Sequence, residues 1–288
     1  MSLLQETIDL SRLYGVKPTR HRGQNFLIDE KVYDDIIAAA DLKKNETILE
    51  VGPGLGFLTL RLAPLVEKVV AVELDKKLTD ALNNRLGVEN VLNVSVFNGD
   101  VMNFNGHWAK KIAPAASENL AVVANLPYTI TSTFLRFFIG GNKMNIMPAR
   151  FVLMLQKEVA ERIIAPAGKM SLLAISVQLY ADPKIVRLVS KKAFWPSPEV
   201  DSAIISIVRT DRWLKQIKAV GGTDTALLHL ARIGFSARRK MLKANLAAGF
   251  QIEASESAQR LESAGIALNA RAQELGLEDW LRLLPLFI

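Results

Sequence analysis

Short apolar runs alternate with amphipathic stretches along the first two thirds of the chain. Five runs have the β-branched content and the turn residues at their ends that are typical of buried strands: Thr47–Val51, Val69–Val72, Val91–Phe97, Leu120–Ala124 and Phe151–Leu155. The segments between them have helical spacing of apolar residues at Phe57–Leu65, Asp75–Leu86 and Ser132–Ile139. This alternation predicts an α/β fold, in which a mostly parallel sheet carries helices on both faces. Two later runs are expected to extend the sheet, Lys184–Val189 and Ala203–Val208.

The pattern changes near Asp211, where the β-branched runs stop. Helical spacing follows at Thr225–Phe235, Arg239–Ala248, Ala258–Ala264 and Ala270–Leu284. We therefore predict an α/β domain over residues 1–210 and a small C-terminal α-helical domain over residues 211–288. Within the first domain, residues 1–28 are expected to form an N-terminal helix and a basic arm, because Lys17–Phe26 is basic, contains glycine and lacks periodicity.

Four successive predicted strands end in residues suited to binding a nucleoside. The first is followed by the glycine-rich turn Gly52–Gly56, the second by Glu73, the third by Asp100 and the fourth by Asn125. Ligands of open α/β sheets lie outside the carboxyl ends of the strands, so these residues are expected to meet in one cleft. A carboxylate at Glu73 suits two ribose hydroxyls, and one at Asp100 suits an adenine amine. Each feature alone also has an ordinary structural explanation, as a turn or a helix cap.

The spacing of the glycines argues against a dinucleotide. A dinucleotide fingerprint has glycines at positions one, three and six, whereas here the third glycine is at position five and Pro53 intervenes.

The loop Asn125-Leu126-Pro127-Tyr128 has the groups that chemistry on an exocyclic amine of a base requires. Asn125 offers an amide oxygen and Leu126 a backbone carbonyl as hydrogen-bond acceptors, while Tyr128 offers a flat face for stacking. Pro127 restricts the turn, which helps to hold both acceptors facing one point. The alternative for this loop is a tight turn beside a buried tyrosine.

The composition of the chain excludes several kinds of catalytic chemistry, and its charge suggests an anionic partner. The chain has no cysteine, which excludes cysteine-ligated zinc, iron–sulfur clusters and a cysteine nucleophile, and we expect no metal. Its net charge is +7, and residues 212–243 hold eight Lys or Arg against one acid, whereas residues 244–288 hold three against six.

We find neither a signal peptide nor an 18-residue apolar stretch, so we expect no membrane contact and a cytoplasmic location. A monomer is expected because no exposed apolar seam stands out.

Taken together, these motifs resemble the bacterial KsgA (RsmA) family of small-subunit ribosomal RNA adenine dimethylases, which is related to the eukaryotic Dim-type enzymes. The resemblance is nearly full length and is carried by Gly23-Gln24-Asn25-Phe26-Leu27, Glu50-Val51-Gly52-Pro53-Gly54-Leu55-Gly56, Val72-Glu73-Leu74-Asp75, Asn125-Leu126-Pro127-Tyr128, Phe194-Trp195-Pro196-Ser197-Pro198-Glu199-Val200-Asp201-Ser202 and Phe235–Leu246. It implies a Rossmann-like class I methyltransferase fold with S-adenosylmethionine as cofactor. The implied cofactor contacts are Asn25, Leu27, Gly52, Gly54, Glu73, Asp100 and Asn125.

The resemblance also implies the substrate, two adjacent adenosines in a hairpin loop near the 3′ end of small-subunit rRNA, each dimethylated within an immature 30S-type subunit. Tyr128 and Phe194 would then sandwich the extruded base, although Trp195 is an alternative outward residue. The expected RNA phosphate contacts are Arg22, Arg238, Arg239, Lys240 and Lys243. The chain departs from the family pattern at Ala237, Lys243 and Ala244, where Gln, Arg and Asn are common, so the basic surface is expected but its individual contacts are not determined.

Three alternatives stay open from the sequence. A large-subunit rRNA adenine methylase that confers macrolide resistance shares the cofactor motifs and the Asn125 loop, but the C-terminal signature argues against it. A ribosome-assembly factor with secondary or lost catalysis is opposed by the intact set of Gly52, Glu73, Asp100 and Asn125. A nicotinamide oxidoreductase is opposed by the glycine spacing.

Overall fold

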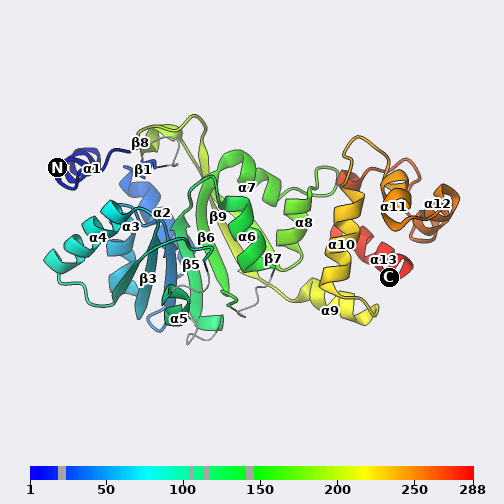
Figure 1. Cartoon of the computed structure of the whole chain (residues 1–288), viewed down its shortest axis with the longest axis horizontal. Helices are drawn as coiled ribbons and strands as arrows, with labels where there is room; N and C mark the ends of the chain where they lie inside the picture. The colour runs from blue at the N-terminus through cyan, green and yellow to red at the C-terminus, as the bar shows by residue number, and fades with distance from the viewer. Residues whose placement is uncertain (19–23, 104–106, 113–116, 141–145) are drawn as a thin grey trace. The chain divides into compact units, whose positions relative to one another are not determined.

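The computed structural model describes residues 1–18, 24–103, 107–112, 117–140 and 146–288 (Figure 1). The chain forms two compact units, residues 1–160 with 184–208 and residues 161–183 with 209–288. The sequence placed the boundary at residue 211 and residues 161–183 in the α/β domain. The structure instead groups this segment with the C-terminal helices, because its helix α8 (Leu172–Gln178) packs against α10 (Asp224–Gly234).

The predicted α/β sheet is confirmed. It has seven strands in the order β4-β3-β2-β5-β6-β9-β7 (Figure 1). In chain order the strands are β2 (Thr47–Val51), β3 (Lys68–Glu73), β4 (Val94–Asn98), β5 (Leu120–Asn125), β6 (Arg150–Gln156), β7 (Ala181–Val189) and β9 (Ser202–Arg209). The first five run parallel to one another, and β9 is antiparallel to β6. Both later runs join this sheet, as expected.

Helices cover both faces of the sheet, since every residue of β2 is buried and β5 is buried up to Asn125. The helical elements that precede or connect these strands are α1 (Leu3–Leu13), α2 (Glu30–Ala40), α3 (Phe57–Leu62), η2 (Ala63–Leu65), α4 (Lys76–Val88), α5 (His107–Ile112), η3 (Ser117–Asn119), α6 (Thr131–Ile139), α7 (Lys157–Ile163) and η4 (Lys191–Ala193). Asp75 caps the N-terminus of α4, and its side chain accepts a hydrogen bond from the Lys77 backbone N–H.

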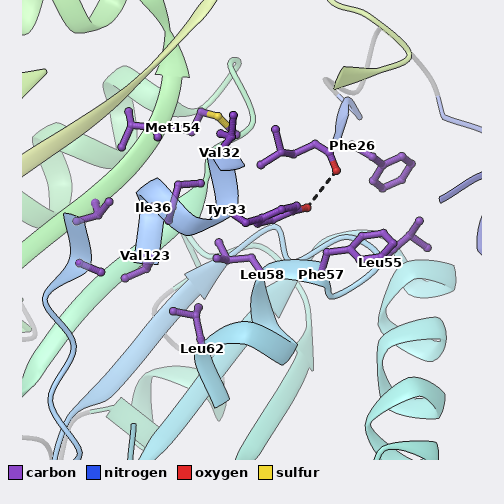
Figure 2. Close-up of a cluster of buried hydrophobic side chains, with 14 of the residues drawn as sticks. Phe26, Val32, Tyr33, Ile36, Leu55, Phe57, Leu58, Leu62, Val123 and Met154 are labelled. Carbon is purple, nitrogen blue, oxygen red and sulfur yellow. Dashed lines mark hydrogen bonds between the residues drawn. The ribbon is translucent and has the colours of Figure 1, made fainter. Parts of the chain in front are cut away.

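A hydrophobic cluster supports the carboxyl end of the sheet (Figure 2). Tyr33 of α2 lies at its centre, and its hydroxyl donates a hydrogen bond of 3.2 Å to the Leu27 carbonyl. The surrounding side chains come from α2, from the turn and helix after β2, and from β5 and β6; labelled among them are Val32, Ile36, Leu55, Phe57, Leu58, Val123 and Met154. Burial of each large side chain contributes about 1.5–3 kcal/mol, so the cluster anchors the glycine-rich turn to the sheet.

A second, two-stranded sheet joins segments far apart in the sequence. Strand β1 (Phe26–Leu27) pairs antiparallel with β8 (Phe194–Trp195), with Leu27 opposite Phe194. The Ile28 backbone N–H extends the pairing with a 2.8 Å hydrogen bond to the Ala193 carbonyl. The Trp195–Pro196 peptide bond that follows is cis. The end of the arm is thereby held next to the segment that carries Phe194.

The second unit is helical, as predicted. Besides α8 and α10 it contains α9 (Arg212–Ala219), α11 (Leu242–Phe250), α12 (Ala254–Ser263), η5 (Ala272–Glu274) and α13 (Leu277–Phe287). Helix α10 packs against α11 and α13, where Trp280 is fully buried and stacks on Phe235 at 6.0 Å between ring centroids. A Cβ at Gly234 would lie 2.4 Å from the Trp280 ring, so this packing requires glycine. No helix within the described ranges is long and apolar enough to cross a membrane.

Candidate cofactor and active site

The carboxyl ends of four parallel strands meet around one cavity. Val51 of β2 is level with Val72 of β3, and Glu73 is level with Asn98 of β4, so these strands end at the same edge of the sheet. The cavity has a volume of about 550 Å³, within the range of roughly 300–1,000 Å³ that is usual for ligand pockets. All the cofactor and catalytic residues predicted from the sequence line it: Asn25, Leu27, Gly52, Gly54, Glu73, Asp100, Asn125, Leu126, Pro127, Tyr128 and Phe194.

The glycine-rich turn presents bare backbone to the cavity. Gly52, Gly54 and Gly56 have φ angles of +67°, +58° and +84°, in the left-handed region that side chains disfavour. A Cβ at Gly54 would lie 3.2 Å from the Phe26 ring, and one at Gly56 would lie 2.4 Å from Leu82. The backbone conformation therefore favours glycine at these two positions, and the surrounding space is tight at both.

Glu73 lies at the end of β3 and is only 7% exposed. One carboxylate oxygen accepts the Gly54 backbone N–H at 3.1 Å and the other accepts the Asp75 backbone N–H at 2.9 Å. Burial raises the pKa of Glu73, and these backbone hydrogen bonds oppose the shift. A carboxylate held in this way keeps lone pairs for further donors. The structure excludes a solvent-facing helix cap for Glu73, since Asp75 caps α4.

Asp100 is exposed at the rim of the cavity, after β4. Its side chain accepts a 2.8 Å hydrogen bond from the Met102 backbone N–H, which fixes the turn that carries it. The neighbouring Asn98 side chain donates to the Glu73 carbonyl at 3.0 Å and to the Leu74 carbonyl at 3.2 Å. The ends of β3 and β4 are thus tied together, and both acids are held on one side of the cavity.

The loop from Asn125 to Tyr128 forms the opposite side. The Leu126 N–H donates to the Met154 carbonyl at 3.1 Å, and the Pro127 carbonyl accepts the Ile130 N–H at 3.2 Å, so backbone hydrogen bonds hold the loop at both ends. The Tyr128 hydroxyl lies 2.8 Å from the Ser202 hydroxyl of β9. Partial burial raises the pKa of Tyr128, so the phenol is neutral near neutral pH.

The structure distinguishes the two neighbouring aromatic residues of β8. Phe194 is only 3% exposed and lines the cavity together with Tyr128, whereas Trp195 is half-buried and is not part of the lining. Phe194 also packs in the hydrophobic cluster, so it serves the core as well as the cavity wall.

Sequence reasoning missed Glu50, which also lines the cavity. Glu50 is 1% exposed, and burial raises its pKa to about 8; the Thr59 hydroxyl opposes this shift and the Glu73 carboxylate adds to it. Glu50 Oε2 and Asn25 Oδ1 are buried, and neither accepts a hydrogen bond from the part of the chain that the structure describes. The signal in the sequence was a carboxylate inside an apolar strand, directly before the glycine turn.

The charge of the cavity decides between cofactor classes. Four acidic side chains line it, those of Glu50, Glu73, Asp75 and Asp100, and none of its described lining residues is Lys, Arg or His. Such a cavity repels a pyrophosphate and attracts a cationic ligand. S-adenosylmethionine carries a sulfonium and an ammonium group, and an ammonium supplies donors for buried acceptors such as Asn25 Oδ1 and Glu50 Oε2. The residues present fit this cofactor and argue against a dinucleotide.

The predicted basic segment belongs to the second unit. Arg238, Arg239 and Lys240 are exposed in the loop between α10 and α11, and Lys243 is half-buried in the first turn of α11. The prediction that Arg239–Met241 are helical was wrong, because α11 begins at Leu242. The fifth predicted RNA contact, Arg22, lies outside the described residues.

Asn245 of α11 holds this loop in place. Its buried side-chain amide donates hydrogen bonds to the Gly234 carbonyl at 2.6 Å and to the Ala237 carbonyl at 3.1 Å. The two bonds connect the end of α10 to the start of the basic loop, so the exposed cations stand on a fixed backbone turn.

A mostly parallel sheet with a glycine turn, two acids and a polar-aromatic loop around an acidic cavity defines the chain as a class I, S-adenosylmethionine-dependent methyltransferase. The family model for ribosomal RNA adenine dimethylases matches residues 17–288, and the chain belongs to this family. It is therefore an rRNA adenine dimethyltransferase, as the motifs indicated.

Individual relatives agree with the family. The chain is 39% identical to ribosomal RNA small subunit methyltransferase A of Dehalococcoides mccartyi, over 98% of this chain and 92% of the relative. It resembles the crystal structure of a dimethyladenosine transferase from Plasmodium falciparum, with 27% identity, a TM-score of 0.74 and coverage of 90% of this chain and 95% of the other. It also resembles the 23S rRNA methyltransferase ErmE, with 25% identity, a TM-score of 0.68 and coverage of 91% and 99%.

Proposed function

We propose that the protein dimethylates the exocyclic amines of two adjacent adenosines in the 3′-terminal hairpin loop of small-subunit rRNA, during ribosome biogenesis in the cytoplasm. The substrate is an immature 30S-type subunit, on which the protein acts as a monomer. The relatives named for the small subunit, at 35–39% identity, support this choice of RNA. The observation that carries the chemistry is the acidic cavity, which has the Asn125 loop as one wall.

The cofactor contacts follow from the positions around the cavity. Glu73 accepts hydrogen bonds from the ribose hydroxyls, and Asp100 accepts one from the adenine amine. Gly52 and Gly54 allow the cofactor to approach the backbone closely, and their positive φ angles support this role. Asn25, Leu27 and Asn125 complete the contacts, and the unsatisfied Asn25 Oδ1 suits a cofactor N–H.

The Asn125 loop orients the target amine. The Asn125 side-chain oxygen and the Leu126 carbonyl accept the two amine N–H bonds, which turns the nitrogen lone pair out of conjugation with the ring. Bound S-adenosylmethionine supplies a methyl group already activated by the sulfonium, so orientation provides most of the acceleration and no basic side chain is required. The amine proton leaves to water. The lack of a histidine among the described lining residues is consistent with this.

Tyr128 and Phe194 hold the extruded base between them. Each base–aromatic stack is worth about 1–3 kcal/mol in sites of this kind. The hydrogen-bonding distance between the Tyr128 and Ser202 hydroxyls supports a fixed orientation of the Tyr128 ring. An adenine in a hairpin loop is unpaired, so the protein avoids most of the cost of base flipping from a duplex.

RNA phosphates bind the exposed cations of the second unit. Arg238 and Arg239 have the planar guanidinium that pairs with phosphate oxygens in bidentate fashion, and Lys240 and Lys243 add point charges. Arg22 of the arm contributes a further contact. Because phosphate contacts carry no sequence information, the choice of adenosine rests on the cavity.

The test is transfer of a labelled methyl group from S-adenosylmethionine to isolated immature small subunits. We expect dimethyladenosine at two neighbouring positions in the 3′-terminal hairpin of the small-subunit rRNA. Label found instead in large-subunit rRNA would replace this proposal with the ErmE-like activity. Absence of label from both RNAs would contradict the proposed reaction.

The variant Asn125→Ala tests the orienting role in the same assay. Turnover is expected to fall by about 100-fold or more, the usual effect of removing one such polar group from an active site. The dissociation constants of S-adenosylmethionine and of the subunit should change much less. Equal losses in turnover and in both affinities would show that Asn125 binds rather than orients.

A further inference from the structure

Helix α1 lies outside the part of the chain that the family model matches, which begins at residue 17. The helix is nevertheless packed onto the first unit. Leu3, Thr7 and Ser11 are buried on one face, and Leu3 and Val16 belong to the hydrophobic cluster that supports the cavity. On α4, the Lys77 ammonium donates a 3.0 Å hydrogen bond to the Gly15 carbonyl, just after the helix. α1 is therefore a docked element of the methyltransferase unit.

Arg85 of α4 connects α1 to the cofactor turn. One guanidinium nitrogen donates a 3.0 Å hydrogen bond to the Glu6 carboxylate of α1, and the other terminal nitrogen donates a 2.5 Å hydrogen bond to the Leu55 carbonyl. The guanidinium carbon also lies 4.6 Å from the centre of the Phe57 ring. A single side chain thus contacts the N-terminal helix on one side and the glycine-rich turn on the other.

The two residues of this region that Arg85 contacts, Leu55 and Phe57, both line the cavity. Leu55 lies between Gly54 and Gly56, and Phe57 is the first residue of α3. Glycine-rich turns gain conformational freedom when their contacts are lost, and a preformed site binds its ligand more tightly than a mobile one. Hydrogen bonds from Gly54 to Glu73 and from Gly56 to Pro53 fix two N–H groups of the turn, and Arg85 fixes its Leu55 carbonyl.

The ion pair between Glu6 and Arg85 is partly shielded from solvent. The Arg85 side chain is 12% exposed and that of Glu6 is 35% exposed. Burial lowers the pKa of Arg85, and the Glu6 carboxylate opposes that shift, so Glu6 offsets part of the cost of burying the charged guanidinium beside the turn. Ion pairs with partial burial are screened by salt less than fully exposed pairs.

We propose that Arg85 is a positioning residue for the cofactor turn, and that helix α1 strengthens S-adenosylmethionine binding by holding Arg85 through Glu6. α1 is thereby part of the cofactor site without touching the cofactor. The inference rests on the cofactor site described above and is independent of which RNA is methylated.

The test measures the dissociation constant of S-adenosylmethionine by calorimetry, without RNA, for Glu6→Gln, Arg85→Lys and the double variant. We expect Arg85→Lys to weaken binding about fivefold or more, the lower end of the range usual for coupled sites. A lysine keeps the charge but cannot contact Glu6 and the Leu55 carbonyl at once. Glu6→Gln should weaken binding in the same direction by less. If α1 acts through Arg85, the double variant binds no more weakly than Arg85→Lys alone.

The matched control is Asp9→Asn, which removes the same charge from an exposed position on α1, where the Asp9 carboxylate contacts Gln5 and Arg12 of the same helix. It should leave cofactor affinity unchanged. Thermal unfolding without cofactor distinguishes a role in cofactor binding from a purely structural role. In a purely structural role, the melting temperature falls while the affinity for S-adenosylmethionine stays the same. That result would overturn the proposal, as would additive effects of the two substitutions or an equal loss in Asp9→Asn. Failure of rRNA methylation in the earlier assay would not affect it.

Discussion

At the scale of single residues, the acidic cavity holds one carboxyl group in an unusual protonation state. Glu50 is almost fully buried, and its pKa is raised from 4.5 to about 8, mainly because burial disfavours the charged form. The folded protein therefore keeps a proton on Glu50 over a pH range in which the unfolded chain has lost it. Glu73, the other buried acid of the cavity, shifts in the same direction for the same reason.

Glu50→Gln tests this state through the pH dependence of stability. Since the folded-state pKa is raised, the stability that protonated Glu50 retains is fully present below pH 4.5 and is lost as the pH rises through about 8. The variant lacks this titration. Between two pH values inside that window, its free energy of unfolding should improve relative to wild type by about 1.4 kcal/mol per pH unit. Urea unfolding without cofactor measures the difference.

Glu67→Gln, at an exposed position, is the control and should follow the wild-type pH dependence. If Glu50→Gln also parallels wild type throughout the window, Glu50 is ionised in the folded protein and the cavity carries the full charge of its carboxylates. That outcome would strengthen the attraction for a cationic cofactor while contradicting the protonation state inferred for Glu50.

The sequence predicted the site residues that lie at strand ends, but it missed Glu50, whose environment is determined by the folded structure. Glu73, Asp100 and Asn125 each follow an apolar run, so one rule about the edge of a parallel sheet groups them correctly. Glu50 lies within a buried strand, where its environment depends on neighbouring strands and helices. Asn25 lies in a segment without periodicity and was implied by family resemblance alone.

At the scale of elements, the sequence pattern predicted correctly those strands whose ends are determined by neighbouring residues in the chain. The run Thr47–Val51 has the same bounds as β2, because it is buried throughout and Gly52 turns the chain at its end. The run Val91–Phe97 was predicted to begin too early, since β4 starts at Val94 and the Val91 N–H bonds back to Leu86 at the end of α4. Strands β1 and β8 contain two residues each and form only by long-range pairing, which periodicity does not reveal.

The basic loop between α10 and α11 shows how one side chain can hold an element. Asn245→Ala removes the hydrogen bonds to the Gly234 and Ala237 carbonyls, one of them buried, at a cost of about 1–3 kcal/mol in stability. Because the loop then loses its fixed turn, the affinity for small subunits should fall. The dissociation constant of S-adenosylmethionine should be unchanged. Filter binding, calorimetry and thermal unfolding measure the three quantities.

Asn245→Asp serves as a comparison of similar size, since it also loses both donors but adds a negative charge. It should weaken subunit binding at least as much as Asn245→Ala. If both variants bind subunits like wild type while their stability falls, the loop does not need a fixed backbone to bind RNA, and Asn245 has a structural role only.

At the scale of the whole molecule, chemistry and charge are divided between the two compact units. The cavity, with its four acidic side chains, belongs to the first unit, and the basic loop belongs to the second. The net charge of +7 therefore describes neither surface, because a cationic cofactor and an anionic RNA require opposite local fields. The sequence showed the basic excess at residues 212–243 and predicted Glu73 and Asp100 in one cleft, whereas the contributions of Glu50 and Asp75 to the cavity appeared only in the folded structure.

Salt dependence distinguishes phosphate contacts from a general effect of net charge. Arg238→Gln with Arg239→Gln lowers the net charge from +7 to about +5, and so does the control Lys110→Gln with Lys111→Gln, at exposed positions of α5. If both arginines bind phosphates, the slope of log affinity for small subunits against log salt should become shallower by about 1.4–1.8 in the first variant only. Equal changes in both variants would show that the protein binds RNA through its overall charge, and that the basic loop makes no specific phosphate contacts.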